Sequence, residues 1–183
     1  MVHGFRPLPC YRLAWPERRV VRHRGSLTRL LRAFSRESVR VQVIRETLAC
    51  PDTSEALALG IDPKQRAWVR EVYLRGDERL WVKARTVISV HSLRGPTKRI
   101  RQLGNRPLGT ALFGPRRWRR SRFQCGLIDT DGYHQVLLAR RSRFQRGCHS
   151  LLVTECFLPD LWHDIRDQPM RSHPIHADHV RPL

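Results

Sequence analysis

Two charged residues fall in rows of side chains that are otherwise apolar. Alternate residues of a β-strand point to the same face of a sheet. In the strand-like segment 67–74, the row that contains Arg70 is completed by Trp68, Val72 and Leu74. In the segment 150–158, the row that contains Glu155 is completed by Leu151, Val153 and Phe157. A charge on a buried face costs free energy unless it is paired, so these two residues need an explanation.

The residues alone leave two explanations open. Arg70 and Glu155 either lie on a solvent face or pair with each other as a buried salt bridge, or else they line a pocket. In a pocket, Arg70 would receive an anion, because a guanidinium binds a carboxylate in a bidentate manner, and Glu155 would accept a hydrogen bond from a hydroxyl group. The chain has no G-x-S-x-G, H-E-x-x-H, P-loop or G-x-G-x-x-G pattern, so we predict no metal and no cofactor.

The segments around these residues predict an α+β fold. Ser26 can cap a helix with apolar residues at positions 27, 30, 31 and 34. Strand-like runs at 39–43, 67–74, 80–90, 122–128, 133–144 and 150–158 are joined mostly by short turns, including a polar hairpin loop at 75–79 and a hairpin turn at 129–132. We expect a single domain at 26–159 with a roughly six-stranded antiparallel sheet and flanking helices. Residues 1–25 would form a basic, mostly irregular arm with a short helix near 17–22, and 160–183 a polar Pro/His-rich tail.

The charge of the chain is unusual. Its 183 residues carry a formal net charge of +19, and the 35 cations are 32 Arg and 3 Lys. Such a balance is typical of nucleic-acid binding, but the arginines are spread along the chain, so a compositional bias toward Arg on solvated faces explains them as well. No run reaches the roughly 20 apolar residues of a membrane span, and the first 16 residues lack a continuous apolar run, so we expect no secretory signal. We therefore expect a soluble, cytoplasmic protein.

The cysteines and histidines predict no metal site. Five cysteines without a C-x-x-C pair indicate reduced thiols rather than a disulfide framework or zinc ligands. His173, His176 and His179 are spaced by three residues in a Pro-rich segment, which is more typical of a loose His-rich tail than of a metal site.

Five short motifs in a fixed order resemble those of the chorismate pyruvate-lyase family. They are WVRE at 68–71, ARTV at 84–87, LGNRPLG at 103–109, RRSR at 140–143 and TECFLP at 154–159. The resemblance runs over residues 26–159. It implies an antiparallel sheet with helices over an enclosed, buried ligand pocket, and the cofactor-independent conversion of chorismate into 4-hydroxybenzoate and pyruvate for ubiquinone biosynthesis.

The resemblance also implies roles for particular residues. The family's ligand-binding positions fall on Leu27, Arg70, Leu108 and Glu155. Arg70 would hold the ring carboxylate, and Glu155 would bind the C4 hydroxyl, either as a general base that assists proton removal or only as a group that orients the hydroxyl. Leu27, which replaces a Met of a familiar member, and Leu108 would enclose the ring. Arg85 of the ARTV strand is a second candidate for anion contact.

Chorismate and 4-hydroxybenzoate are the expected partners of a monomer that binds no nucleic acid. The alternatives are a non-catalytic module that binds a small acid, and a basic nucleic-acid-binding protein.

Overall fold

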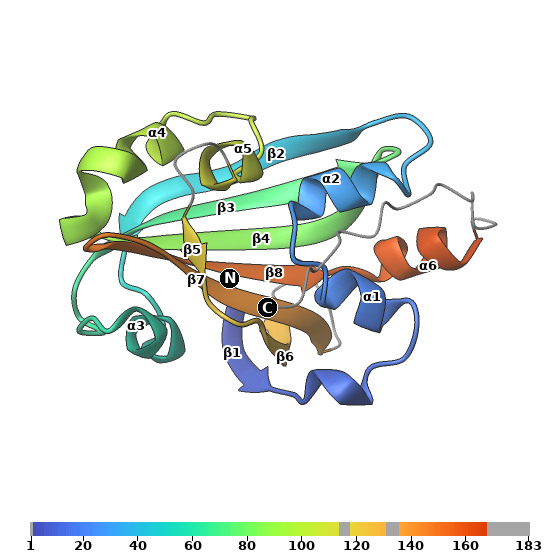
Figure 1. The fold of residues 1–183 in the computed structure, drawn as a ribbon, viewed down its shortest axis with the longest axis horizontal. Coiled ribbons are helices and arrows are strands. Elements are labelled where there is room, and N and C mark those ends of the chain that lie inside the picture. Colours follow the sequence, from blue (N-terminus) through green and yellow to red (C-terminus); the bar gives the residue numbers. More distant parts are fainter. Residues whose placement is uncertain (1, 114–117, 131–135, 168–183) are drawn as a thin grey trace, which may run out of the picture.

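An antiparallel sheet runs through the computed structural model, which describes residues 2–113, 118–130 and 136–167 (Figure 1). Within these ranges the sheet has eight strands, in the order β1-β6-β7-β8-β4-β3-β2, with β5 paired to β7. The strands are β1 Val2–Pro7, β2 Val39–Ala49, β3 Ala67–Gly76, β4 Arg79–Ser89, β5 Arg119–Arg120, β6 Gln124–Thr130, β7 Leu137–Arg146 and β8 His149–Phe157. The hairpin β3–β4 and the antiparallel α+β class are confirmed.

Short helices connect and cover these strands. They are α1 Glu17–Val21, α2 Leu27–Arg32, α3 Thr53–Leu59, α4 Lys98–Arg101, α5 Gly109–Leu112 and α6 Pro159–Asp167. The predicted cap of α2 is confirmed, because the Ser26 hydroxyl accepts a hydrogen bond from the backbone N–H of Arg29. Helix α3 begins with a capping box of Asp52 and Glu55, which satisfies two backbone donors at its N-terminus.

The sheet has more strands than the six that the sequence predicts. Strand β1 was missed because it contains Gly4 and ends at Pro7, two residue types that are depleted in strands. Strand β5 has only two residues and exists through its pairing with β7. Both are short additions to the sheet whose pairing depends on partners far away in the sequence.

The packed structure extends beyond the predicted boundaries at residues 25 and 159. Strand β1 pairs with β6, and Val20 and Val21 of α1 are fully buried, so part of the N-terminal segment packs with the sheet and the core. At the other end, Leu161 and Ile165 of α6 are buried in the same core cluster. The three histidines at 173, 176 and 179, and part of the hairpin turn at 129–132, lie outside the described residues.

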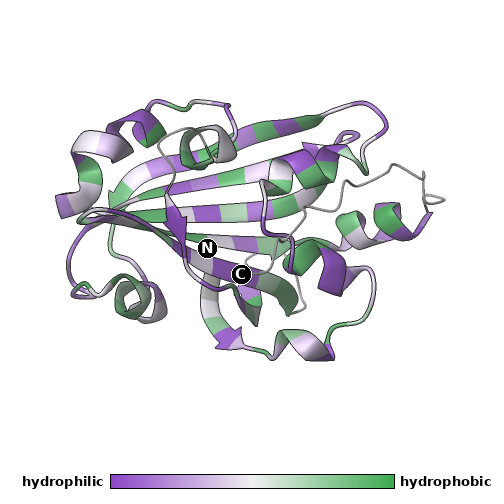
Figure 2. Cartoon of the chain, in the orientation of Figure 1, coloured by the Kyte–Doolittle hydropathy of each residue, from purple (hydrophilic) through white to green (hydrophobic). Residues whose placement is uncertain are grey.

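Both faces of the sheet are covered, and they have different covers. Residues from α1, α2, α4, α5 and α6 pack with strand residues such as Val72 and Val153 on one side, which we call the pocket face. Leu59 of α3 packs with Val69, Val87 and Leu152 on the other side, the α3 face. Hydrophilic and hydrophobic residues recur along the central strands (Figure 2), so polar groups enter a sheet that is buried on both sides.

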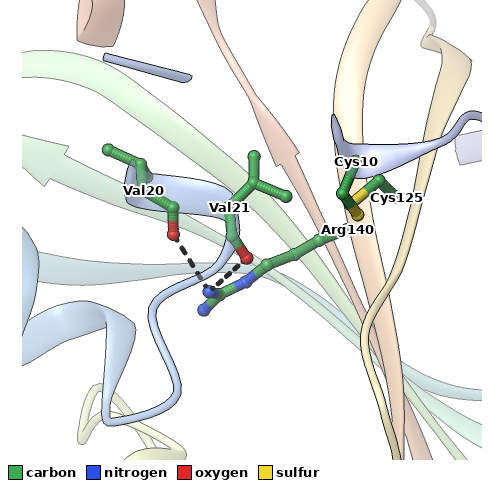
Figure 3. Close-up of a disulfide and its surroundings, with 5 residues drawn as sticks. All are labelled: Cys10, Val20, Val21, Cys125 and Arg140. Atoms are coloured by element: carbon green, nitrogen blue, oxygen red, sulfur yellow. Dashed lines mark hydrogen bonds between the residues drawn. A yellow bond between two sulfur atoms is a disulfide. The ribbon is translucent and has the colours of Figure 1, made fainter. Parts of the chain in front are cut away.

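A disulfide joins Cys10 to Cys125 across 115 residues (Figure 3). The expectation of five reduced thiols is therefore wrong for these two residues. The two cysteines can pair because the fold of the N-terminal segment brings their Cα atoms to within 5.6 Å of each other. Cys50 and Cys148 are free and exposed, and Cys156 is free and buried.

We expect the Cys10–Cys125 disulfide to stabilise the protein. A cross-link that closes a long loop typically contributes about 2–4 kcal/mol to the free energy of unfolding. Urea unfolding of the oxidised protein and of Cys125→Ser would measure this difference, with Cys148→Ser as the exposed control. Equal unfolding midpoints for Cys125→Ser and the unsubstituted protein would contradict the expectation.

Candidate active site

A cavity on the pocket face brings together the four residues that the sequence analysis singled out: Leu27, Arg70, Leu108 and Glu155. Its floor is formed by side chains of β3, β4, β7 and β8, and its cover by α2, α5 and the turns that lead into them. Apolar side chains make up most of the wall, including Val72, Leu74, Ala84, Leu112, Phe144 and Val153. Such a lining with a few polar groups is typical of a small-molecule site.

Strand register places Arg70 and Glu155 at two ends of this cavity. Arg70 lies opposite Thr86, which lies opposite Val153, and Glu155 is two residues further along β8. With strands about 4.8 Å apart and a rise of about 3.3 Å per residue, the two Cα atoms are roughly 12 Å apart. Arg70 forms its ion pair with Glu46 and Glu155 forms its own with Arg140, so the two residues do not pair with each other and the interpretation as a mutual salt bridge is wrong.

Arg70 is buried and held from two sides. Its side chain forms an ion pair with the carboxylate of Glu46 on β2 and donates a hydrogen bond of 2.6 Å to the backbone carbonyl of Gly104. Gly104 belongs to the same 103–109 segment as Leu108. Arg70 thus fastens the loop that covers the cavity to the sheet that forms its floor.

A β-bulge selects Glu46 as the partner of Arg70. Val43 lies opposite Val72, but the register shifts between Val43 and Arg45, so that Glu46 rather than Arg45 faces Arg70. One extra residue in a strand reverses the faces of all residues that follow. Arg45 consequently turns to the α3 face, where it lies 3.4 Å from the carboxylate of Glu71.

Glu155 lies among cations from two neighbouring strands. Arg140 on β7 is its direct cross-strand neighbour, and its Nε donates to a carboxylate oxygen of Glu155. Arg120 approaches the same oxygen to 3.8 Å. Because Arg140 also donates to the carbonyls of Val20 and Val21 (Figure 3), the position of Glu155 depends on the N-terminal segment that the disulfide anchors.

Burial and repulsion between positive charges lower the pKa values of two side chains at the Glu155 end of the cavity. Burial, aided by the charge of Arg140, lowers the pKa of Arg120 to about 10 although Glu155 opposes the shift. Burial, together with Arg140 and Arg120, also lowers the pKa of His23. Arg120 therefore remains charged at pH 7, and the lowered pKa of His23 favours its neutral form.

The covering segments meet above the cavity. Leu27 in the first turn of α2 is buried, and Leu108 directly precedes α5. A Cβ atom added at Gly109 would lie only 2.8 Å from the hydroxyl oxygen of Ser26, so the two segments approach each other as closely as a glycine allows. Leu27 and Leu108 are thus placed to enclose a ligand between α2 and α5.

The structure separates Arg85 from this site. Arg85 points to the α3 face, where its guanidinium donates to Glu55 at 2.7 and 3.1 Å and to Glu71 at 2.8 Å. All three side chains are buried. The expectation that Arg85 contacts a bound anion is therefore wrong, because neighbouring residues of a strand face opposite sides and Thr86, not Arg85, lines the cavity.

We expect Arg85→Met to reduce stability without changing substrate binding. The variant leaves the carboxylates of Glu55 and Glu71 buried without their shared partner, which typically costs about 3–5 kcal/mol. Thermal unfolding would report the loss of stability. A Michaelis constant that rises strongly in the folded variant would contradict this assignment and return Arg85 to the list of anion contacts.

Sequence reasoning missed three charged residues of the site: Glu46, Arg120 and Arg140. Arg140 had a detectable signal, since it belongs to the RRSR motif and to a strand that can pair with the strand of Glu155. Glu46 lies beyond the predicted strand at 39–43, and only the pairing of β2 with β3 shows that the bulge turns it toward Arg70. Arg120 was hidden in a run of arginines around β5.

Neither a membrane span nor a metal cluster is found in the described parts of the chain. None of the described helices is long and apolar enough to cross a bilayer. Likewise, no three His, Cys, Asp or Glu side chains within residues 2–113, 118–130 and 136–167 are grouped so that they could hold a metal ion. The side chains that surround the cavity supply hydrogen-bond donors, one carboxylate and apolar walls, and could enclose a small organic anion.

Comparison with known proteins agrees with a site of this class. The family model described as chorismate lyase matches residues 16–167. A relative from Marinobacter nauticus named "Probable chorismate pyruvate-lyase" is 43% identical over 155 residues, which cover 85% of this chain and 82% of the relative. A relative of the same name from Methylococcus capsulatus is 42% identical over 146 residues, covering 74% of this chain and 90% of the relative. The chain belongs to the chorismate lyase family.

Solved structures offer a more distant likeness. The C-terminal domain of the histidine utilization repressor from Pseudomonas syringae aligns with a TM-score of 0.46 and 11% identity, covering 67% of this chain and 92% of that one. The possible transcriptional regulator YydK from Bacillus subtilis aligns with a TM-score of 0.46 and 12% identity, covering 67% and 60%. A likeness at this level has no bearing on the function.

Proposed function

We propose that this chain is a chorismate pyruvate-lyase, which converts chorismate into 4-hydroxybenzoate and pyruvate as the first committed step of ubiquinone biosynthesis. The observation that carries the proposal is the cavity with Arg70 at one end and Glu155 at the other, in a member of the chorismate lyase family. Chorismate carries a ring carboxylate at C1 and a hydroxyl at C4, on opposite sides of the ring. A pocket with a cation and a carboxylate at its two ends matches that arrangement.

In the reaction, the bond between C3 and the ether oxygen breaks and C4 loses its hydrogen as a proton. The electrons of the C4–H bond form the new ring double bond, and the electron pair of the C3–O bond leaves with the enolpyruvyl oxygen. The ring becomes aromatic, and the released enolate takes up a proton to give pyruvate. No oxidant, reductant or metal is required for this balance.

Each site residue has a role in this proposal. Arg70 binds the ring carboxylate through its guanidinium. Glu155 accepts a hydrogen bond from the C4 hydroxyl and takes the proton from C4. Leu27 and Leu108 exclude water and hold the ring in the reactive orientation. A positioned general base typically contributes about 10²–10⁴-fold, so positioning and electrostatics must supply much of the acceleration.

The test is purified protein with chorismate and without added metal or cofactor, followed by chromatography. Equimolar 4-hydroxybenzoate and pyruvate over many turnovers are expected. If no product forms and 4-hydroxybenzoate still raises the melting temperature, the chain is a binding module for a small acid. If neither effect is seen and the protein binds nucleic acid with a steep salt dependence, the net charge of +19 defines its function instead.

The remaining expectations are a monomeric, cytoplasmic enzyme that binds no nucleic acid. Size-exclusion chromatography with light scattering tests the first, and fractionation of cells that produce the protein tests the second. The disulfide between Cys10 and Cys125 makes fractionation informative, because disulfides are rare in a reducing cytosol.

A further inference from the structure

The Glu155 end of the cavity carries an excess of positive charge. The buried guanidinium group of Arg140 and the largely buried one of Arg120 share the single carboxylate of Glu155. At the opposite end, the charge of Arg70 is balanced by Glu46. The cavity is therefore close to neutral at the Arg70 end and positive at the Glu155 end. Charges removed from water are costly unless they are compensated, so a second anion is expected beside Glu155.

Arg140 has a buried donor without an acceptor. Its side chain is fully buried, its Nε donates to Glu155, and its Nη1 donates to the carbonyls of Val20, Val21 and His23 at 2.9–3.3 Å. Its Nη2 has no hydrogen-bond partner within the described parts of the chain. A buried donor that lacks an acceptor costs about 1–3 kcal/mol, and more when it is charged. Because Arg140 lines the cavity, a ligand in the cavity can supply the acceptor.

Arg120 is held in a similar way. Its Nε donates to the hydroxyl of Ser142 at 3.0 Å and its Nη1 to the carbonyl of Arg24 at 3.2 Å. The guanidinium is stacked over the ring of Phe123 at 4.0 Å. Its remaining group, Nη2, is 3.8 Å from Glu155, too far for a hydrogen bond. The guanidinium is thus fixed in orientation while one of its ends remains available.

We infer that Arg120 and Arg140 form the subsite for the enolpyruvyl carboxylate of chorismate; this inference rests on the proposed function. The connectivity of the substrate gives the reason. If Arg70 holds the C1 carboxylate and Glu155 the C4 hydroxyl, the ether at C3 is attached next to C4 and must lie at the Glu155 end. Arg120 and Arg140 are the two cations that line the cavity there.

The same two residues would stabilise the leaving group. When the C3–O bond breaks, its electron pair moves to the oxygen of the departing enolate, and the negative charge grows next to the guanidinium groups. Preformed donors at the place where charge develops lower the barrier more than they strengthen ground-state binding. The ion pair with Arg140 also holds the Glu155 carboxylate in place beside C4. Arg140 would therefore contribute both to substrate binding and to the position of the group that removes the proton.

The test compares the substrate with the aromatic product, which lacks the second carboxylate. We expect Arg120→Met to lower kcat/KM for chorismate by about 10–100-fold, because a charge-assisted hydrogen bond is lost. The dissociation constant of 4-hydroxybenzoate, measured by calorimetry on the same preparation, should change by less than about threefold, since the product does not contact the removed group. If the role of Arg120 were merely structural, its replacement would weaken the binding of chorismate and of 4-hydroxybenzoate together.

Two further variants protect this comparison against loss of folding. Arg140→Lys keeps the charge but not the planar fork, and should again reduce kcat/KM for chorismate more than it weakens product binding. Arg141→Met is the matched control, because Arg141 is the next residue in β7 but bonds to Ser54 and Gln124 away from the cavity, and it should leave both values unchanged.

The outcomes separate the inference from the proposed function. If the unsubstituted protein forms no product from chorismate, the proposed function fails. Suppose instead that the unsubstituted protein turns over chorismate, and that Arg120→Met either impairs chorismate turnover and product binding equally or changes neither. The subsite inference then fails and the proposed function stands.

Discussion

Replacing Glu155 with glutamine is expected to slow turnover of chorismate by about 10²–10⁴-fold, the usual contribution of a positioned general base. The amide oxygen can still accept the hydrogen bond from Arg140, so the substitution removes the basic group without leaving that guanidinium unpaired. The Michaelis constant should not rise, because the binding groups at both ends of the cavity remain. Steady-state kinetics on the purified variant measures both values.

The matched control for this prediction is Glu71→Gln. Glu71 is also a buried carboxylate bound by an arginine, but it lies on the α3 face. We expect it to lower stability and leave kcat unchanged. A kcat for Glu155→Gln within about threefold of the unsubstituted enzyme would remove Glu155 from the role of base. In that case Glu155 only orients the substrate hydroxyl.

Replacing Arg70 with methionine is expected to weaken chorismate and 4-hydroxybenzoate alike, by about 10–100-fold for each. Both molecules carry the ring carboxylate that Arg70 is proposed to hold, so the effect should appear in the Michaelis constant of the substrate and in the dissociation constant of the product. This pattern differs from that expected for Arg120, where only the substrate is affected. Kinetics and calorimetry on the two variants, side by side, distinguish the ends of the cavity.

Glu46 provides the second half of this experiment. Because Glu46 orients Arg70 without lining the cavity, it is a positioning residue, and Glu46→Gln should raise the Michaelis constant with little change in kcat. In the double variant with Arg70→Met, the effect of Glu46→Gln should disappear, since it acts through Arg70. Additive effects of the two substitutions would contradict the coupling. Unchanged product binding in Arg70→Met would contradict the assignment of Arg70 as the group that holds the ring carboxylate.

Local sequence predicted the parts of this protein that depend on local chemistry. The Ser26 cap begins α2 as expected, and the β3–β4 hairpin forms where two strand-like runs are joined by a polar loop. Strand alternation also placed Arg70 and Glu155 in apolar rows, and both residues line the cavity on the pocket face. These features follow from the two-residue period of a strand and from capping, which each segment carries by itself.

The partners of the charged residues were decided by tertiary structure alone. Alternation in β2 would place Arg45 opposite Arg70, but the bulge after Val43 places Glu46 there. Arg85 differs from Thr86 by one position, and only the pairing of β4 with its neighbours determines which of them faces the cavity. The disulfide and the three carbonyls that hold Arg140 come from an N-terminal segment more than 100 residues away. The two-residue period of a strand determines which of its side chains share a face. Strand register and packing determine which face lines the cavity and which charged groups meet there.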